Sequence, residues 1–229
     1  MQKFIDEFTL NFLEDNRYEY ILKGFGNTLL ISLFAVLLGI VIGFLTAIIR
    51  SNHDKTGRMK AGNFICRVYL TVMRGTPTMI QLLIIYYVIF ASSNVPKILV
   101  AVIAFGLNSG AYVAEIVRSG IMSVDEGQAE AGRSLGLNYR QTMQYIILPQ
   151  AFKNVLPALA NEFIVLLKET SISGYIGLMD LTHGGDIIRG ITFSAFMPLV
   201  AVAVIYLLLV TGLSYAVNKL ERRLRVNER

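Results

Sequence analysis

The sequence predicts an all-α integral membrane protein with five transmembrane helices, because its apolar residues are gathered into long runs that lack charge. The run from Gly24 to Ile49 has 26 uncharged residues. As a helix it is about 39 Å long, whereas the hydrocarbon core of a bilayer is ~30 Å thick. A second uncharged run extends from Gly190 to Asn218. A helix buried in a soluble domain needs no such length, so the chain is expected to cross the membrane.

Five spans are expected near residues 24–49, 68–91, 97–117, 154–174 and 192–217. No removable signal peptide is expected, because Met1 to Tyr20 carries five acidic residues and the first apolar run is too long for one. No internal repeat is apparent. Residues 1–229 are therefore predicted to form one membrane domain.

Clusters of basic residues beside the apolar runs predict the orientation in the membrane. Cytoplasmic loops are enriched in Lys and Arg, which gather here in the connection 50–67 and in the tail after Asn218. Both are expected to be cytoplasmic, and an odd number of spans then puts the N-terminus outside. The net charge of +5 follows from this clustering, so nucleic-acid binding is discarded. The basic residues are Arg50, Lys55, Arg58, Lys60, Arg67, Lys219, Arg222, Arg223, Arg225 and Arg229.

The N-terminal segment, residues 1–23, is net acidic and carries Phe4, Phe8 and Phe12 at helical spacing. This pattern suits a short amphipathic helix on the outer membrane surface. A disordered lead is the alternative.

Two features commonly associated with metal or redox sites are weak here. His183-Gly184-Gly185-Asp186 offers too few metal ligands and is interpreted as an extracellular turn. The single cysteine, Cys66, excludes an intramolecular disulfide and a multi-cysteine metal site. No metal site is therefore expected in this chain.

The polar stretch 119–153, between the third and fourth predicted spans, carries the signals of a helix-turn-helix on the cytoplasmic side. The apolar residues of its second helix recur on one face, which is expected to lie in a groove of the membrane domain or of a docked cytoplasmic protein. The cap and stop signals are Ser123 with Glu126, Gly136, and Asn138 with Gln141, and the apolar face is Tyr139, Met143, Ile146 and Ile147.

Three motifs carry a family resemblance. The first is Glu130-Ala131-Gly132, followed at fixed spacing by Gly136, Ile146 and Leu148-Pro149; the others are Arg74-Gly75-Thr76-Pro77 and Asn161-Glu162-Phe163 to Lys168-Glu169-Thr170-Ser171. The first resembles the EAA loop of binding-protein-dependent ABC importer permeases, except that Gly132 stands where the family usually has a second Ala. The others are similar to the polar amino acid subfamily that serves histidine, glutamine, arginine and cystine.

This resemblance implies a multi-pass permease subunit of an ABC importer in the bacterial inner membrane, not an enzyme. Its partners would be an ABC ATPase, an extracytoplasmic amino-acid-binding protein, a second permease subunit in a homodimer or heterodimer, the polar amino acid and membrane lipid. No cofactor is expected in this chain, since it has no GxxxxGK[ST] loop, and ATP and magnesium belong to the ATPase. The implied ATPase-coupling residues are Glu130, Ala131, Gly132, Gly136, Leu148 and Pro149. A passive amphipathic connector is the alternative for this loop.

Glu162 places a carboxylate within a predicted span, which is costly unless the group is paired, protonated or facing water. One interpretation is that Glu162, with Asn161, lines a midpoint cavity and meets the ammonium group or a basic side chain of the substrate. The other is a structural bond to a Ser, Thr or Arg of a neighbouring helix.

The remaining polar candidates lie in the second and third predicted spans. Arg74 is expected to snorkel to the interface or to pair with Glu115 or Glu162. Gly75-Thr76-Pro77 predicts an unwound helix with exposed carbonyl groups, or a plain kink. The small residues between Asn108 and Glu115 favour close helix packing, and a structural role for Glu115 stays open. The candidate substrate-binding residues are Gly75, Thr76, Asn108, Glu115, Asn161 and Glu162.

Two other functions share some of these features. An ion-coupled secondary amino acid transporter also buries carboxylates and breaks helices, but it usually has two related halves in one chain. A membrane-embedded hydrolase would need a nucleophile with a base, or an HExxH helix, within the spans. Neither pattern is present in the sequence, which favours the ATP-driven importer.

Overall fold

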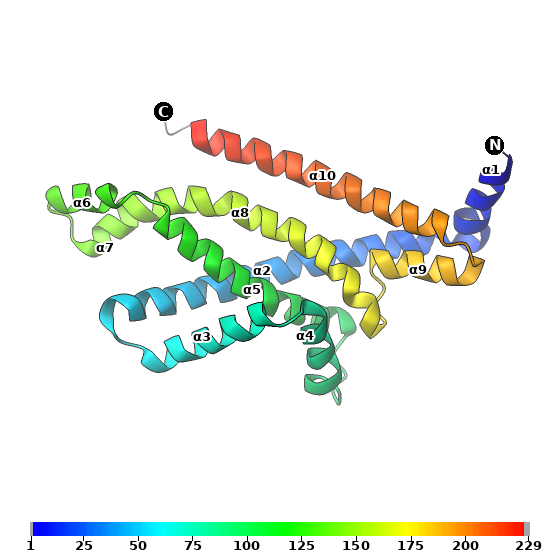
Figure 1. Cartoon of the computed structure of the whole chain (residues 1–229), viewed down its shortest axis with the longest axis horizontal. Coiled ribbons are helices and arrows are strands. Elements are labelled where there is room, and N and C mark those ends of the chain that lie inside the picture. The colour runs from blue at the N-terminus through cyan, green and yellow to red at the C-terminus, as the bar shows by residue number, and fades with distance from the viewer. Residues whose placement is uncertain (1, 227–229) are drawn as a thin grey trace.

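The computed structural model describes residues 2–226, so Met1 of the N-terminal segment and Arg229 of the basic tail lie outside the described residues. Every regular element in this range is helical (Figure 1). The longer helices are α2 (Tyr18–Thr56), α3 (Lys60–Gly75), α5 (Lys97–Met122), α8 (Leu148–Glu169), α9 (Leu181–Thr192) and α10 (Phe196–Val226). The shorter elements are α1 (Gln2–Phe8), α4 (Thr78–Ile84), α6 (Glu126–Ser134), α7 (Tyr139–Thr142), the π-helical turns η1 (Thr9–Leu13), η3 (Ile85–Ile89) and η4 (Met143–Ile147), and the 3-10 turns η2 (Glu14–Asn16) and η5 (Thr170–Ile176).

Three of these helices, α2, α5 and α10, are long and apolar enough to cross a membrane, and α3 with α4 and η3 makes a fourth if that bent pair is one span. The fourth predicted span, 154–174, corresponds to α8, which is not apolar enough by the same measure. The reason is its polar content, which includes Lys153, Asn161 and Glu162. A span lined with polar residues must turn them away from lipid.

The predicted second span, 68–91, is not one continuous helix. α3 ends at Gly75, and α4 leaves it at an angle of 113°. Thr76 and Pro77 between them are extended, with φ of −125° and −64°. The unwinding is therefore observed rather than the plain kink, because proline lacks the N–H donor and the residue before it avoids helical backbone angles. The carbonyl groups of Met73 and Thr76 at the break accept from the side chain of Gln81.

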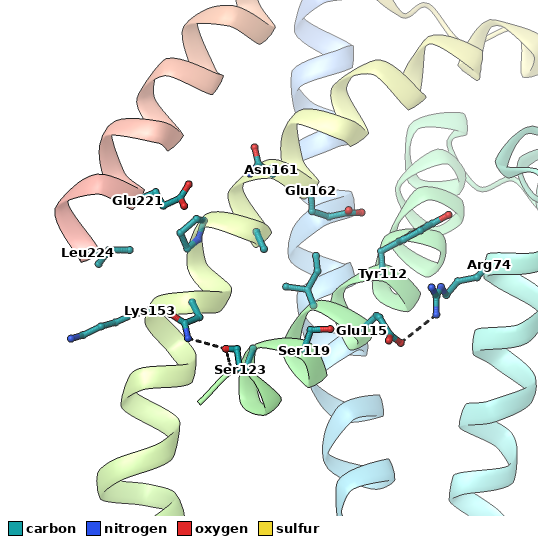
Figure 2. Close-up of a pocket in the computed structure, with 15 residues that line it drawn as sticks. Arg74, Tyr112, Glu115, Ser119, Ser123, Lys153, Asn161, Glu162, Glu221 and Leu224 are labelled. Atoms are coloured by element: carbon teal, nitrogen blue, oxygen red, sulfur yellow. Dashed lines mark hydrogen bonds and ion pairs between the residues drawn. The ribbon is translucent and has the colours of Figure 1, made fainter. Parts of the chain in front are cut away.

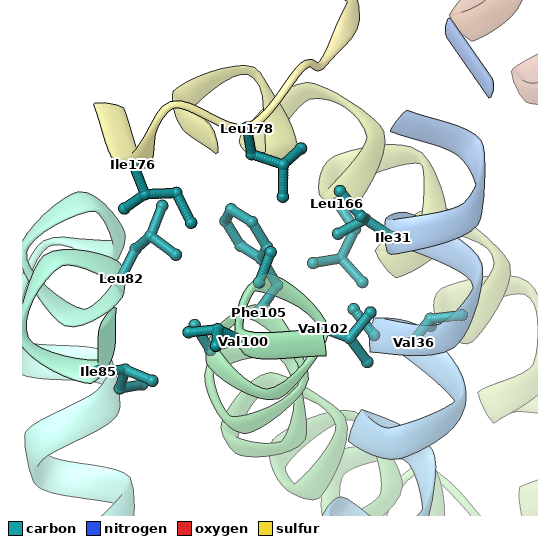
Figure 3. Close-up of a cluster of buried hydrophobic side chains, with 13 residues drawn as sticks. Ile31, Val36, Leu82, Ile85, Val100, Val102, Phe105, Leu166, Ile176 and Leu178 are labelled. Atoms are coloured by element: carbon teal, nitrogen blue, oxygen red, sulfur yellow. The ribbon is translucent and has the colours of Figure 1, made fainter. Parts of the chain in front are cut away.

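The main hydrophobic core joins helices that are distant in sequence (Figure 3). Phe105 of α5 is completely buried, and the same cluster contains side chains from five other elements. These include Ile31 of α2, Leu82 of α4, Leu166 of α8 and Ile176 of η5. Burying an aromatic ring among aliphatic side chains from five elements fixes α4 and α8 against the α2–α5 pair.

Glycine allows α2 and α5 to approach closely. A Cβ atom at Gly43 would lie 2.5 Å from Cγ1 of Val113, and one at Gly39 would lie 2.8 Å from Oγ of Ser109. A Cβ at Gly110 on α5 would likewise lie 2.7 Å from the Tyr69 hydroxyl. The predicted close packing around the small residues of α5 is confirmed.

Replacing Gly43 by alanine is expected to destabilise the protein by about 1–3 kcal/mol, since the new methyl group overlaps Val113. Gly26 is a matched control on the same helix, because a Cβ there meets nothing within 4 Å. Gly26→Ala should be neutral or slightly stabilising, given the higher helix propensity of alanine. Thermal unfolding of both purified variants tests the difference, and equal midpoints would contradict the close approach.

The predicted extracellular turn at His183–Asp186 is wrong, because these residues belong to α9. Asp180 caps this helix by accepting hydrogen bonds from the backbone N–H groups of Thr182 and His183. A Cβ at Gly184 would lie 2.5 Å from the carbonyl oxygen of Tyr20. The glycine that suggested a turn instead brings α9 against α2.

Of the two alternatives for the N-terminal segment, the helix is confirmed and the disordered lead is wrong. α1 and η1 cover residues 2–13, and α2 begins at Tyr18, within the predicted segment 1–23. Phe4 and Phe8 are exposed, whereas Phe12 is buried against α9 and α10. The segment thus packs on the helices at one end and presents aromatic rings outward at the other.

The polar stretch 119–153 contains the predicted helix, turn and second helix, but its second helix is continuous with α8. The left-handed Gly136, with φ of +78°, follows α6, and the predicted Asn138–Gln141 capping box is present. Ser123 is not a cap, because Asp125 accepts the first-turn hydrogen bond from Gly127. The second helix then continues from α7 through the π-helical turn η4 into α8 without a break. In this turn the backbone N–H of Leu148 donates to the carbonyl of Met143, five residues earlier, directly before Pro149, which has no N–H donor.

Candidate functional site

A cavity of about 620 Å³ lies between α5, α8 and α10, with Arg74 of α3 at its edge (Figure 2). Its acidic and basic groups are Glu115, Glu162, Glu221, Arg74 and Lys153. The other lining residues are Tyr112, Ile116, Ser119, Gly120, Ser123, Asn154, Pro157, Ala158, Asn161 and Leu224. A cavity of this volume is in the range that holds a small polar molecule.

Glu162 lines the cavity from α8 and is buried, with only 9% of the residue exposed. Its Oε1 accepts a hydrogen bond of 2.8 Å from Oγ of Ser109, a completely buried residue on α5. The predicted structural bond to a neighbouring Ser is therefore present, and the same residue lines the cavity. The two interpretations of Glu162 are compatible, because one oxygen holds the side chain in place and a carboxylate has further acceptor capacity.

Arg74 and Glu115 form an ion pair across the same cavity. The NH1 nitrogen of Arg74 lies 3.3 Å from Oε2 of Glu115, and about 40% of each side chain is exposed (45% and 37%). Of the alternatives for Arg74, pairing with Glu115 is the one observed. Since the pair is half exposed, either group is accessible to a charged ligand without full desolvation.

The structure brings together half of the predicted substrate-binding residues. Glu115, Asn161 and Glu162 line the cavity, with Asn161 exposed. Gly75, Thr76 and Asn108 do not line it, and they lie at the break between α3 and α4.

Asn108 is engaged in an amide cluster that holds the helix break. Its Nδ2 donates to Oε1 of Gln81 at 2.9 Å and to the carbonyl of Met73 at 3.3 Å. Nε2 of Gln81 in turn contacts the same Met73 carbonyl at 2.9 Å, and the carbonyl and hydroxyl oxygens of Thr76 at 3.0 and 2.8 Å. These bonds satisfy carbonyl groups at the end of α3 that have no helical partner. For Asn108 and Thr76 the structure therefore supports a structural role.

Replacing Gln81 by leucine is expected to lower the free energy of unfolding by about 1–3 kcal/mol, because the carbonyl groups of Met73 and Thr76 lose a donor and the buried amide of Asn108 loses its acceptor. The side chain of Gln144 is exposed and forms no hydrogen bond among residues 2–226, so Gln144→Leu is the control. Thermal unfolding in detergent compares the two. Equal midpoints would show that the amide cluster does not stabilise the break.

Several cavity residues were not predicted from the sequence, among them Tyr112, Ser119, Asn154 and Pro157, although helical spacing from Glu115 and Asn161 points to them. Tyr112, Glu115, Ile116 and Ser119 recur at i, i+3, i+4 and i+7 on α5. Asn154, Pro157 and Asn161 recur at i, i+3 and i+7 on α8. Each set forms one helix face. Polar residues on one face of an otherwise apolar helix are the signal that would have identified them.

The predicted coupling residues gather at one end of the molecule, around α6 and the start of α8 (Figure 1). Glu130, Ala131, Gly136, Leu148 and Pro149 are exposed, and Gly132 is buried. A Cβ at Gly132 would lie 2.7 Å from Cγ2 of Thr142 on α7. Glycine, where the family usually has alanine, thus lets α6 lie closer to α7.

Within residues 2–226, no group of three or more His, Cys, Asp and Glu side chains is arranged to hold a metal ion.

A known protein family matches most of the chain. A family model described as "Binding-protein-dependent transport system inner membrane component" matches residues 39–226. The chain belongs to this family. It is therefore a membrane component of a transport system and not an enzyme, and ATP hydrolysis belongs to a separate chain.

Relatives of this permease extend over almost its whole length. A putative glutamine transport system permease protein of Rickettsia typhi is 41% identical over 210 residues, which covers 91% of this chain and 94% of that protein. The arginine transport system permease protein of Bacillus subtilis is 36% identical over 211 residues, with the same coverage.

Among solved structures, the permease is similar to an amino acid ABC transporter crystallised with histidines. The identity is 40%, the TM-score is 0.84, and the match covers 93% of this chain and 98% of that one. An inward-facing form of the MetNI methionine ABC transporter has a TM-score of 0.73 at 20% identity, which shows a shared fold.

Proposed function

We propose that the permease is the transmembrane subunit of an ABC importer for polar amino acids, and that its substrate passes through the cavity between α5, α8 and α10. The observation that carries this proposal is the charge pattern of that cavity: Glu162 and the Arg74–Glu115 pair line the same space. An amino acid presents an ammonium and a carboxylate group to such a site. The relatives named as glutamine and arginine permeases support the same substrate class.

Substrate recognition would divide between the two sides of the cavity. Glu162, with the amide of Asn161, faces the position of an ammonium group, and Ser109 orients the carboxylate. Arg74 lies across from it (Figure 2) and matches a carboxylate, because a guanidinium donates two parallel hydrogen bonds. Glu115 then holds Arg74 in place until the substrate carboxylate competes for it.

In this proposal α8 is the fourth of the five spans along the chain. Its polar residues would be tolerated at membrane depth because Asn154, Asn161 and Glu162 face the cavity instead of lipid. The N-terminus would be outside and the C-terminus cytoplasmic, as the clusters of Lys and Arg predict.

Labelling of introduced cysteines tests this orientation. Cys66 is buried, so the natural chain gives a low background with a membrane-impermeant maleimide. Ser134→Cys on α6 is expected to react only in inside-out vesicles, and Asn94→Cys in the exposed 91–96 connection only in intact cells. The reverse pattern would overturn the orientation.

The exposed end of the molecule around α6 would dock the ATPase. Leu135 and Tyr145 are 78% and 66% exposed beside the coupling residues, so an apolar surface there is left uncovered in the single chain. α7, η4 and α8 form one continuous helical run, and α8 lines the cavity. A displacement of α6 and α7 by the ATPase would therefore move α8 and change the cavity. This continuity suits an alternating-access pathway driven from the cytoplasm by ATP.

Reconstitution tests the proposed function. The permease, with its ATPase and binding protein in proteoliposomes, is expected to take up glutamine or arginine only when ATP is inside with the ATPase. Uptake driven by an ion gradient without ATP would instead support the secondary transporter, which family membership does not favour.

A further inference from the structure

A second polar cleft lies on the other side of Arg74, between the end of α2 and α3. It has a volume of about 370 Å³ and is lined by Arg50, Arg67, Thr71 and Arg74, together with Leu70 and Gly75. No carboxylate is among these residues. Three guanidinium groups, which carry positive charge and only donate hydrogen bonds, and one hydroxyl group surround the same space. Such a site matches an anion.

Two of the three arginines of this cleft have no ion-pair partner among the described residues. The Nε atom of Arg50 is buried and has no hydrogen-bond partner among the described residues. Within the same range neither Arg50 nor Arg67 forms an ion pair, and the carboxylate of Glu115 is already engaged with Arg74 from the other side. Leaving a buried hydrogen-bond donor unpaired costs more free energy when the donor belongs to a charged group than when it belongs to a neutral group. A ligand that accepts a hydrogen bond from Arg50 is therefore favoured.

The position of Arg50 along α2 indicates where the cleft lies relative to the membrane surface. Arg50 is the first charged residue after the 26 uncharged residues from Gly24 to Ile49, so it marks the end of the hydrocarbon-spanning part of α2. α3 runs back beside this end, because a Cβ at Gly62 would lie 3.3 Å from Ile49. Arg50 thus places one end of the cleft near the lipid headgroups, and the cleft extends from there along α3 to Arg74.

A neighbouring cleft of about 230 Å³ shares Arg50 and opens between α2 and α5. Ala47, Ala114, Ile121 and Met122 supply apolar lining there, and Arg118 and Asp54 supply opposite charges. An anionic phospholipid has apolar acyl chains attached to a negatively charged headgroup. It therefore suits an apolar surface that lies next to a cationic one.

We propose that the cleft of Arg50, Arg67, Thr71 and Arg74 binds the phosphate group of an anionic phospholipid. Basic pockets between transmembrane helices hold anionic headgroups, and arginine binds phosphate through paired hydrogen bonds. Because Arg74 also pairs with Glu115 in the substrate cavity, the bound phosphate shares one guanidinium group with that cavity.

Native mass spectrometry of the purified full-length permease tests the proposal, with phosphatidylglycerol and phosphatidylcholine of identical acyl chains as probes. The natural protein is expected to bind phosphatidylglycerol about tenfold more tightly than phosphatidylcholine. Arg67→Gln, at an exposed position, should weaken phosphatidylglycerol binding by roughly five- to tenfold and leave phosphatidylcholine binding unchanged. Arg50→Gln should do the same, but its half-buried position makes Arg67→Gln the decisive variant.

The control is Arg223→Gln, which removes an exposed positive charge from α10 outside both clefts. It should leave phosphatidylglycerol binding as it is. An equal loss in Arg223→Gln and Arg67→Gln would mean that general surface charge attracts the lipid, and would overturn the site. Competition by inorganic phosphate, with no preference between the two lipids, would assign the cleft to a free anion and overturn the lipid proposal.

Discussion

Glu162→Gln is expected to lower ATP-driven amino acid uptake by about tenfold or more while the protein still inserts and assembles. The change keeps the size of the side chain, and its amide oxygen can still accept the hydrogen bond from Ser109. It removes the negative charge that would bind the ammonium group of the substrate, and a hydrogen bond to a charged group contributes about 1.5–3 kcal/mol. Uptake of labelled glutamine or arginine into proteoliposomes measures the loss.

Glu169→Gln is the matched control for Glu162→Gln, because it makes the same change two turns further along α8, outside the cavity. It should keep uptake within about twofold of the natural protein. If Glu162→Gln transports normally, the carboxylate does not bind substrate. If the variant is lost from the membrane instead, the bond to Ser109 is its main role and the substrate assignment is wrong.

The second large effect is expected at the exposed end around α6, where Glu130→Arg and Gly136→Pro should abolish copurification of the ATPase. Glu130 is exposed, so reversing its charge changes the docking surface without disturbing the core. Gly136 has φ of +78°, which proline cannot adopt, and its N–H donates to the carbonyl of Arg133. The turn between α6 and α7 should therefore reorient.

The control for the charge reversal is Asp6→Arg, at an exposed position on α1 at the opposite end of the molecule (Figure 1). All three variants should be present in the membrane at normal levels, and only Asp6→Arg should retain the ATPase in a pull-down. Normal ATPase binding by both loop variants would leave α6 and α7 as a passive connector.

Local signals in the sequence predicted several parts of the fold well. The uncharged run of α2, the chain break at Gly75-Thr76-Pro77 and the cap at Asn138 depend on neighbouring residues alone. The same holds for the family motifs, since they are fixed spacings along the chain, and the family match confirms the family that they indicated. Glycine had two meanings that sequence could not separate: Gly136 ends a helix, whereas Gly184 lies within one and packs on α2.

Hydropathy and local helix signals determined by themselves that the chain is helical and crosses a membrane, because burial in lipid and backbone hydrogen bonding depend on the composition of each segment. Only the tertiary structure decided which polar residues share a site. Asn108 and Glu115 lie on one helix, yet the first holds the α3–α4 break and the second pairs with Arg74 at the cavity. Their roles differ because each faces a different neighbouring helix, and the packing of helices distant in sequence sets which neighbour that is.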